Sequence, residues 1–258
     1  MKQYCKNWKQ TLACVALIAI VPFSSIEASI VYSEDFEVGG TGNQPLSNAG
    51  WVAYVRDDGQ LFTGQGTPGF DAGNGNVAIG NDPEQGQFVF WWPGNSGDTL
   101  DRALVVLESS ASNYPTGLHT DSLASISWME RTNVEESQWS LALQIDDGNW
   151  YVQNRAHDST TTWSEEIFNF TPTASAWSDL NFIAGTSLNV GSELTNPLPS
   201  GQITAFGLYG EGIYDGSNGQ TQRFDDFTVA IPEPGTLVLL GFAFGTLMIF
   251  RRRNIYNL

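Results

Sequence analysis

The stretch SLALQIDDGNWYVQNR, residues 140–155, alternates apolar and polar residues on either side of Asp147-Gly148. An Asp-Gly dipeptide accommodates the positive φ angles of a tight turn, so we expect two antiparallel strands joined as a hairpin. Because successive side chains of a strand point to opposite faces, each strand has one apolar side. That side consists of Leu141, Leu143 and Ile145 in the first strand, and of Trp150 and Val152 in the second.

Similar short runs recur along the chain on both sides of this hairpin. Each is rich in β-branched and aromatic residues and is bounded by Gly, Asn, Asp or Pro, which is typical of strands. No segment between the two ends of the chain reads as a long amphipathic helix. We therefore predict an all-β fold, a β-sandwich that occupies residues 29–230 as one domain. Nine strands are expected, at residues 51–56, 87–92, 103–107, 123–131, 138–145, 150–155, 180–184, 202–209 and 223–231.

Residues 1–28 have the features of a secretory signal peptide. Three lysines precede an apolar stretch at residues 11–23, and small residues follow it. The uninterrupted apolar part is shorter than the roughly 20 residues that span a bilayer, so we expect signal peptidase to cut after Ala28. A lipoprotein signal is the alternative, although its lipid acceptor, Cys14, stands at the start of the apolar stretch rather than after it.

Removal of this segment takes away both cysteines and all three lysines of the chain. Residues 29–231 then contain five arginines and 26 Asp and Glu residues, a net charge of −21. Without disulfides, the stability of the domain must come from its core or from bound ions. We expect no nucleic-acid partner, because such binding depends on Lys and Arg neutralising phosphates. So many acids mainly keep a surface soluble, but clustered carboxylates also bind calcium outside the cell.

The sequence offers no recognisable catalytic constellation. Two histidines remain after export, His119 and His157, in polar, loop-like contexts without the spacing of metal ligands. The motifs of serine hydrolases, zinc proteases and phosphate-binding loops are absent, and no thiol nucleophile is left. We therefore expect a protein that is not an enzyme, although two of the many carboxylates could still form a glycosidase site.

Two acidic clusters stand at opposite ends of the expected domain: YSEDFEVGG at residues 32–40 and RFDDFTV at residues 223–229. The first and last strands of a jelly roll often lie side by side, so we expect a jelly-roll-like sandwich in which carboxylates of both clusters converge on one structural calcium ion. In the alternative they are outward-facing strand acids, one of them paired with Arg223 for little gain in stability. The expected calcium ligands are Glu34, Asp35, Asp225 and Asp226.

The stretch QFVFWWPGN, residues 87–95, holds the best candidate for a ligand contact. Trp91 and Trp92 must point to opposite faces of a strand, so one indole lies near solvent unless both faces are covered. An exposed indole offers an apolar face and a polar donor to a sugar ring. We expect Trp91 or Trp92 to contact a carbohydrate, although most tryptophans in an all-β domain lie in the core.

The C-terminal part of the chain carries a second apolar segment. Residues 235–250 are uncharged and mostly apolar, and as a helix they would rise about 24 Å against a hydrocarbon core of roughly 30 Å. Arg251, Arg252 and Arg253 follow directly and would hold the end of the chain in the cytoplasm. The sequence thus predicts a single short transmembrane helix with the acidic domain outside, which by itself fits an ordinary membrane anchor.

Residues 231–254, IPEPGTLVLLGFAFGTLMIFRRRN, resemble a PEP-CTERM sorting signal. The triplet Pro232-Glu233-Pro234, the apolar helix and the arginine cluster occur in the order and position typical of that family. The resemblance implies that residues 231–258 are recognised by a membrane-embedded exosortase, which cuts at or near the triplet and passes the protein to the cell surface or matrix. Such proteins occur mainly in Gram-negative bacteria that make exopolysaccharide. Proline keeps the triplet extended, where a protease can read it.

The opening and closing strands, together with QITAFGLYG at residues 202–210, are also similar to jelly-roll and concanavalin-like carbohydrate-binding domains. This likeness implies that the domain binds a carbohydrate. We expect an exported, non-enzymatic protein of the cell surface or biofilm matrix. Its C-terminal helix would anchor it transiently in the inner membrane, and after processing it would associate with exopolysaccharide. A purely structural matrix protein and a secreted glycan hydrolase are the alternatives.

Overall fold

The computed structural model describes residues 28–57, 60–63, 77–83, 85–92, 100–132, 138–146, 148–155, 161–184, 186–213 and 221–233. Ala28–Pro232 form one compact unit with its own core. Most of the expected signal peptide, His157, Pro234, the apolar segment 235–250 and the three arginines after it lie outside the described residues. Within the described ranges, no helix has the length and apolar character needed to cross a membrane.

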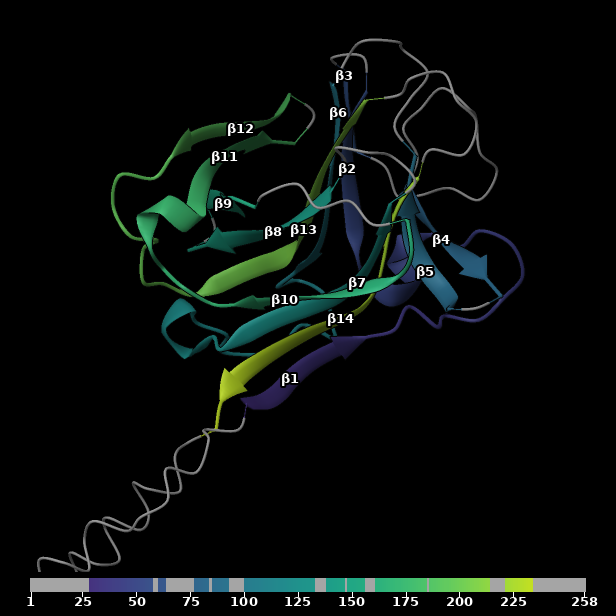
Figure 1. Ribbon diagram of the computed structural model, residues 1–258, viewed down its shortest axis with the longest axis horizontal. Helices are drawn as coiled ribbons and strands as arrows, with labels where there is room; N and C mark the ends of the chain where they lie inside the picture. The colour runs from purple at the N-terminus through teal and green to yellow at the C-terminus, as the bar shows by residue number, and fades with distance from the viewer. Residues whose placement is uncertain are drawn as a thin grey trace, which may run out of the picture. The chain divides into compact units, whose positions relative to one another are not determined.

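The described residues form two β-sheets and no α-helix (Figure 1), which confirms the all-β prediction. One sheet has the order β10-β7-β14-β5-β4, and β1 also pairs with β14. Its six strands are β1 (Ala28–Glu34), β4 (Val77–Asp82), β5 (Gly86–Trp91), β7 (Ser125–Thr132), β10 (Ser164–Asn169) and β14 (Gln222–Pro232).

The second sheet has eight strands in the order β12-β11-β9-β8-β13-β6-β2-β3. They are β2 (Val52–Asp57), β3 (Gln60–Thr63), β6 (Leu100–Glu108), β8 (Gln138–Ile145), β9 (Asn149–Gln153), β11 (Trp177–Ile183), β12 (Ser187–Glu193) and β13 (Ile203–Ile213). Short 3-10 turns lie in the connections at Leu46–Ala49, Thr120–Ser122 and Ala174–Ala176.

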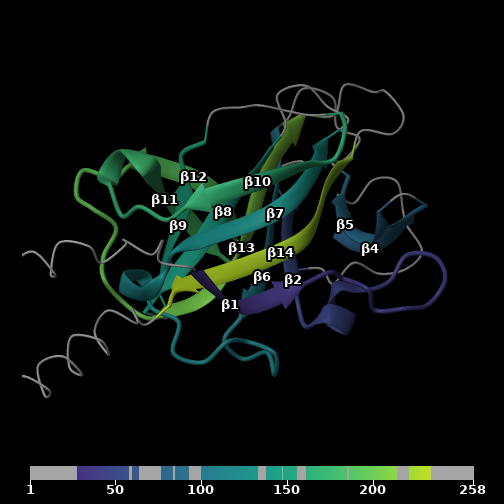
Figure 2. The same cartoon turned by 60° about the horizontal axis from the view of Figure 1, so that its bottom comes forward.

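The two sheets pack face to face around an aromatic core, and Figure 2 shows β10, β7 and β14 in front of β8, β13 and β6. Trp51 is fully buried, and its ring centre lies 5.2–6.3 Å from those of Phe36, Phe206, Phe224 and Phe227. Aromatic pairs at such distances contribute about 0.5–1.5 kcal/mol each beyond their burial. This cluster stabilises a domain that has no cysteine for a disulfide.

All nine predicted strands are present, and the five strands outside those nine ranges lie at sheet edges. β10 and β4 end the order of the six-stranded sheet, β12 and β3 end that of the eight-stranded sheet, and β1 pairs with β14 alone. Edge strands are commonly short and polar, since one side of their backbone has no ladder partner. The acidic SEEIFN of β10 and the glycine-containing SLNVGSE of β12 fit that description.

The hairpin predicted at residues 140–155 forms between β8 and β9, with Ile145 paired to Asn149. In its turn Asp146 has a positive φ angle of 52°, one residue before the Asp147-Gly148 dipeptide to which positive φ angles were assigned. The loop therefore has three residues instead of two, and Asp147 lies outside the described residues. The apolar side of β8 points into the core between the sheets, whereas Trp150 and Val152 of β9 lie on the outer face.

A second apolar cluster covers the outer face of the eight-stranded sheet. Its buried members are Leu104, Val106, Ala142, Trp150, Val152, Leu180, Leu188, Ala205 and Tyr209. β12, an edge strand of this sheet, also contacts β6 and β2 near the opposite edge. The sheet thus curls over its own outer face, and this face positions the candidate site.

The first and last strands lie side by side (Figure 1), which confirms the adjacency expected from the jelly-roll prediction. Ala28 pairs with Pro232 at one end, and Glu34 pairs with Phe227 at the other. β14 therefore includes the first residue of the Pro-Glu-Pro triplet. Ala28, after which signal peptidase is expected to cut, and Pro232, the first residue of the triplet, thus pair at one end of the two strands.

Candidate functional site

A pocket of about 140 Å³ lies beside the apolar cluster on the outer face of the eight-stranded sheet and shares two residues with it. It is built from β8, β9, β12 and β13 and from the two residues that follow β9. Pockets that enclose drug-sized molecules measure about 300–1,000 Å³, so this one suits part of a ligand, such as one sugar residue of a chain. The lining residues are Ser140, Val152, Gln153, Asn154, Arg155, Val190, Tyr209 and Glu211.

Two pocket residues on β13 belong to a chain of hydrogen bonds. The Tyr209 hydroxyl donates to Glu211 Oε1 at 2.5 Å, and Arg102 Nε donates to the same oxygen at 3.0 Å. Burial, and then the Glu211 charge, raises the pKa of Tyr209 far above its ordinary value, so the hydroxyl stays protonated. This chain holds a carboxylate in a fixed position at the pocket, where it can accept a hydrogen bond from a ligand hydroxyl.

The side-chain oxygen of Gln153 is buried and has no hydrogen-bond partner among the residues that the structure describes. Buried acceptors are nearly always hydrogen-bonded, and one left alone costs about 1–3 kcal/mol. Gln153 also lines the pocket, so a turn of its amide toward the pocket would let a ligand donate a hydrogen bond to this oxygen. Sequence reasoning missed Gln153, and the available signal was a polar residue ending the otherwise apolar run WYV.

Arg155 connects the pocket to the other sheet. Its guanidinium lies 2.7 Å from Glu130 Oε2 and 2.8 Å from Glu166 Oε2, and it donates to the Trp139 carbonyl at 2.8 Å. Glu130 lies in β7 and also accepts from the Trp128 indole N–H at 3.0 Å. Burial raises the pKa of Glu130, and the Arg155 charge opposes that shift. The ion pair therefore fixes the segment after β9 against the six-stranded sheet.

The two tryptophans expected to contact a sugar lie at the end of β5. Trp91 is fully buried and packs against Trp139 in the core, with ring centres 6.0 Å apart. A sugar contact at Trp91 is therefore wrong, because the ring lies between the two sheets. Trp92 is partly exposed, and its contact with a carbohydrate stays a prediction.

The two acidic clusters approach each other where β1 meets β14. Phe36 and Asp226 both have positive φ angles, 52° and 49°, so the backbone of each segment bends sharply there. The Glu34 carboxylate already has partners among its sequence neighbours. It accepts hydrogen bonds from the Phe36 backbone N–H at 3.0 Å and from the Tyr32 hydroxyl at 3.3 Å. Glu37, which was not among the expected ligands, accepts from the Gln87 backbone N–H at 2.8 Å.

The carboxylates of this acidic cluster, Asp35, Glu37, Asp225 and Asp226, influence one another electrostatically. Burial, and then the charges of Asp35 and Glu37, raises the pKa of Asp226. Burial raises the pKa of Asp225 to about 8, with the charges of Asp226 and Glu37 acting in the same direction. Asp226 thus lies within electrostatic reach of two other expected ligands, Asp35 and Asp225, and of Glu37 in addition.

A cation for this acidic cluster is missing among the described residues. Arg223, the alternative partner for these acids, lies 3.3 Å from Asp82 instead. Asp225 Oδ1 accepts from the Asp226 backbone N–H at 2.9 Å, and Asp226 Oδ2 accepts from Gln85 Nε2 at 3.4 Å. Across the described ranges, no three His, Cys, Asp or Glu side chains are grouped closely enough to hold a metal ion. Calcium binding would require these side chains to move together.

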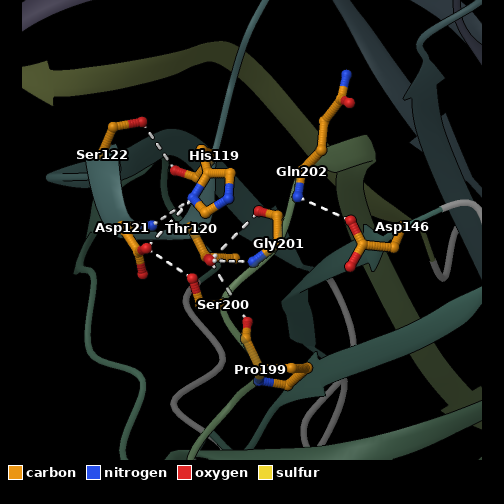
Figure 3. Close-up of polar contacts among 9 residues, drawn as sticks. All are labelled: His119, Thr120, Asp121, Ser122, Asp146, Pro199, Ser200, Gly201 and Gln202. Atoms are coloured by element: carbon orange, nitrogen blue, oxygen red, sulfur yellow. Dashed lines mark hydrogen bonds and ion pairs between the residues drawn. The ribbon is translucent and has the colours of Figure 1, made fainter.

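His119 lies in a loop, and its contacts stabilise the local structure (Figure 3). It forms a β-bridge with Gln202, and its Nδ1 accepts a hydrogen bond from the Asp121 backbone N–H at 3.3 Å, which caps the 3-10 turn that follows. Ser200 Oγ donates to Asp121 Oδ2 at 2.6 Å, and Asp146 Oδ1 accepts from the Gln202 backbone N–H at 2.9 Å. These contacts join two loops and the β8–β9 turn, and they account for the polar residues of this corner.

Among solved structures, the chain is similar to the CBM22-1 xylan-binding domain of Xyn10C from Paenibacillus barcinonensis. The two share 12% sequence identity with a TM-score of 0.39, over 82% of this chain and 100% of that domain. No curated protein matches the chain.

The C-terminal part of the chain matches a known family model. Residues 230–253 match the model of the PEP-CTERM protein-sorting motif. The matched range contains the Pro232-Glu233-Pro234 triplet and all three of Arg251, Arg252 and Arg253. The chain is therefore an exported protein that carries the PEP-CTERM motif, through which an exosortase sorts its substrates.

Proposed function

We propose that the β-sandwich is a non-enzymatic carbohydrate-binding domain, and that the exported protein associates with exopolysaccharide through the pocket on the eight-stranded sheet. The unpartnered acceptor of Gln153 in this pocket is the observation that carries the proposal. Sugar hydroxyls both donate and accept hydrogen bonds. A hydroxyl that reaches Gln153 Oε1 would remove the cost of a buried acceptor without a partner.

Other groups of the pocket suit the same ligand. Val152 and Val190 supply apolar surface for the C–H face of a sugar ring. Glu211 and Ser140 supply an acceptor and a hydroxyl for the ring's polar edge. The pocket is lined mostly by polar and charged side chains, with Val152, Val190 and the Tyr209 ring as its apolar part, so it offers many hydrogen-bonding groups to a hydroxyl-rich ligand.

Affinity electrophoresis of residues 29–232 through gels that contain neutral exopolysaccharide from the producing strain tests this proposal. We expect the domain to be retarded, and we expect Gln153→Leu and Tyr209→Phe to weaken the retardation several-fold. Gln202→Leu, at the opposite end of β13 and exposed, is the matched control and should migrate like the wild type. No retardation of the wild type would favour a purely structural matrix protein, and release of reducing ends would favour a glycan hydrolase.

The acidic cluster at the β1–β14 pair supports a second proposal, one structural calcium ion. Calcium prefers six to eight oxygen ligands at 2.3–2.6 Å, and carboxylates that raise each other's pKa gain the most from a cation. Asp35, Glu37 and Asp226 are exposed, so their side chains are free to turn toward a common ion. Bound calcium would link the first strand of the domain to the last.

The sorting motif supports the last part of the proposal, the route to the surface. Pro232 ends β14 and pairs with Ala28, so a cut at or near the triplet falls at the edge of the folded domain. After cleavage, β1 would continue to hold the new C-terminus in the sheet. The sandwich would then be released to the cell surface or matrix as a complete folded unit.

A further inference from the structure

Two arginines face each other on the outer side of the six-stranded sheet. Arg131 of β7 and Arg223 of β14 are Cα partners in the antiparallel pair. Side chains directly opposite each other on neighbouring strands are within reach, and like charges in such a pair are destabilising. Both are largely buried, with 28% and 20% of the side-chain surface exposed. Such an arrangement needs negative charge nearby.

The ion pairs among the described residues supply only part of that negative charge. Asp82 of β4 lies 3.5 Å from Arg131 Nη1 and 3.3 Å from Arg223 Nη1, so one carboxylate serves two guanidinium groups. Arg155, by contrast, has two carboxylates within 2.8 Å. Burial, and then the Arg131 charge, lowers the pKa of Arg223, which Asp82 opposes. Among the described ion pairs, the charges at Asp82 therefore sum to one excess positive charge.

Hydrogen-bond donors are also in surplus at these two arginines. Arg131 Nε donates to the Thr161 carbonyl, and Arg223 Nε donates to Thr221 Oγ1, each at 3.0 Å. Both Nη1 atoms are directed to Asp82. The hydrogen bonds that these two arginines form with described residues use Nε and Nη1 and leave both Nη2 groups unused. As far as the described residues extend, both Nη2 groups are thus left for a bound acceptor.

Aromatic rings surround the arginine pair. The Arg223 guanidinium lies 5.1 Å from the ring centre of Phe88, which packs edge to face with Trp163 at 5.7 Å. The Trp163 indole N–H is buried and has no acceptor among the described residues. Phe90 is the Cα partner of Arg223 across β5 and β14, and alternation places Trp92 on the same side of the sheet. Both rings are partly exposed beside the cations.

We propose that Arg131 and Arg223 form a second binding site, which takes the carboxylate of a uronic acid residue in an acidic polysaccharide. The Nη2 groups of the two arginines can each donate a hydrogen bond to one carboxylate, and the excess positive charge beside Asp82 neutralises it. Phe90 and Trp92 supply flat apolar surface for the sugar ring that carries the carboxylate. This site lies on the other sheet from the Gln153 pocket and is independent of it.

Calorimetric titration of residues 29–232 with oligogalacturonate, at low and at physiological ionic strength, tests the site. We expect binding that Arg131→Gln/Arg223→Gln weakens at least tenfold. Thr186→Glu/Thr195→Glu, exposed and on the other sheet, adds the same negative charge and should retain most of the affinity. Asp82→Asn removes the competing internal carboxylate and should strengthen binding, a gain that misfolding cannot imitate.

Three results would overturn the proposal: no binding of oligogalacturonate, equal binding by the arginine double variant, or an unchanged affinity of Asp82→Asn. The methyl ester of the same oligosaccharide and inorganic phosphate distinguish the ligand. We expect the ester to bind at least tenfold more weakly and phosphate to compete only weakly. Phosphate that binds as tightly as the sugar would mean a bare anion site and would contradict the uronate assignment. Retention on neutral polysaccharide is measured separately, so failure of either site leaves the other testable.

Discussion

Glu130 and Asp225 are carboxylates of the six-stranded sheet that each expose only 2% of their surface, yet their surroundings differ. Glu130 lies 2.7 Å from the Arg155 guanidinium and accepts a hydrogen bond from the Trp128 indole. Asp225 accepts from the Asp226 backbone N–H, and other carboxylates act on its pKa. Burial raises the pKa of both groups, but only Glu130 has a cation that opposes the shift.

The comparison separates a charge that the chain neutralises itself from one that it leaves to the solvent. At Glu130 the cation, the donors and the carboxylate all come from the protein, so the group is part of the fold. At Asp225 a proton or a metal ion must neutralise the charge, since an isolated buried carboxylate is costly. The stability of the first region should therefore be insensitive to solution conditions, and that of the second should follow pH and calcium.

The largest expected effect is at the buried ion pair of Glu130 with Arg155. Arg155→Met leaves Glu130 buried without its cation, and removal of one partner of a buried pair costs about 3–5 kcal/mol. Arg102→Met, which breaks a pair with 19% and 30% of its side chains exposed, should cost about 0–1 kcal/mol. Urea unfolding of residues 29–232 measures both, and equal losses would remove the distinction between buried and exposed pairs here.

Calcium should give the next largest effect, at the acidic cluster. Calcium at 100 times its dissociation constant would add about 2.7 kcal/mol to the free energy of unfolding. The thermal midpoint of the domain should rise by several degrees and return on chelation. Asp225→Asn/Asp226→Asn should abolish the response. A thermal midpoint that is identical in calcium and in chelator would contradict the calcium proposal.

A smaller effect is expected from pH in calcium-free solution. The pKa of Asp225 is raised from 3.8 to about 8 in the folded state, so the folded protein holds more protons than the unfolded chain between these values. Its contribution to stability is complete below about pH 4 and is lost as the pH rises through about 8. Asp225→Asn should flatten this decline, as measured by urea unfolding between pH 5 and pH 8. An unchanged slope would show that Asp225 is ionised in the folded domain.

The smallest effect is expected at Glu37, whose charge raises the pKa of both Asp225 and Asp226. Glu37→Gln keeps an acceptor for the Gln87 backbone N–H but removes the charge. The pH dependence of the calcium-free domain should shift slightly toward lower pH. Carboxylate titration by NMR measures the shift, and a pKa of Asp225 that stays in place would place Glu37 outside the cluster.

The fold was predictable from sequence where a strand has a neighbouring strand on each side. The β8–β9 hairpin and the long β13 and β14 have strong apolar alternation, and all three were predicted. The edge strands β10 and β12 were missed, because their polar residues face solvent along an unpaired edge and resemble loops. The adjacency of β1 and β14 was predicted from the general order of a jelly roll, and no local pattern encodes it.

The candidate sites were predictable only in part. Asp35, Asp225 and Asp226 were found because acids cluster in the sequence itself. Gln153 was not found, since it becomes important only when curling of the sheet brings β8, β9, β12 and β13 into one pocket. Trp91 and Trp92 are identical by type, and only the packing of the second sheet decides that Trp91 is core.

The central claim is that the sandwich is delivered outward by a cut at the end of β14. Intact mass spectrometry of the mature protein from an exosortase-positive host tests this most directly. We expect a chain that begins near Ser29 and ends at or near Pro232, without the apolar segment. A mature species that still carries Arg251, Arg252 and Arg253 would contradict it and would identify the segment as a permanent anchor.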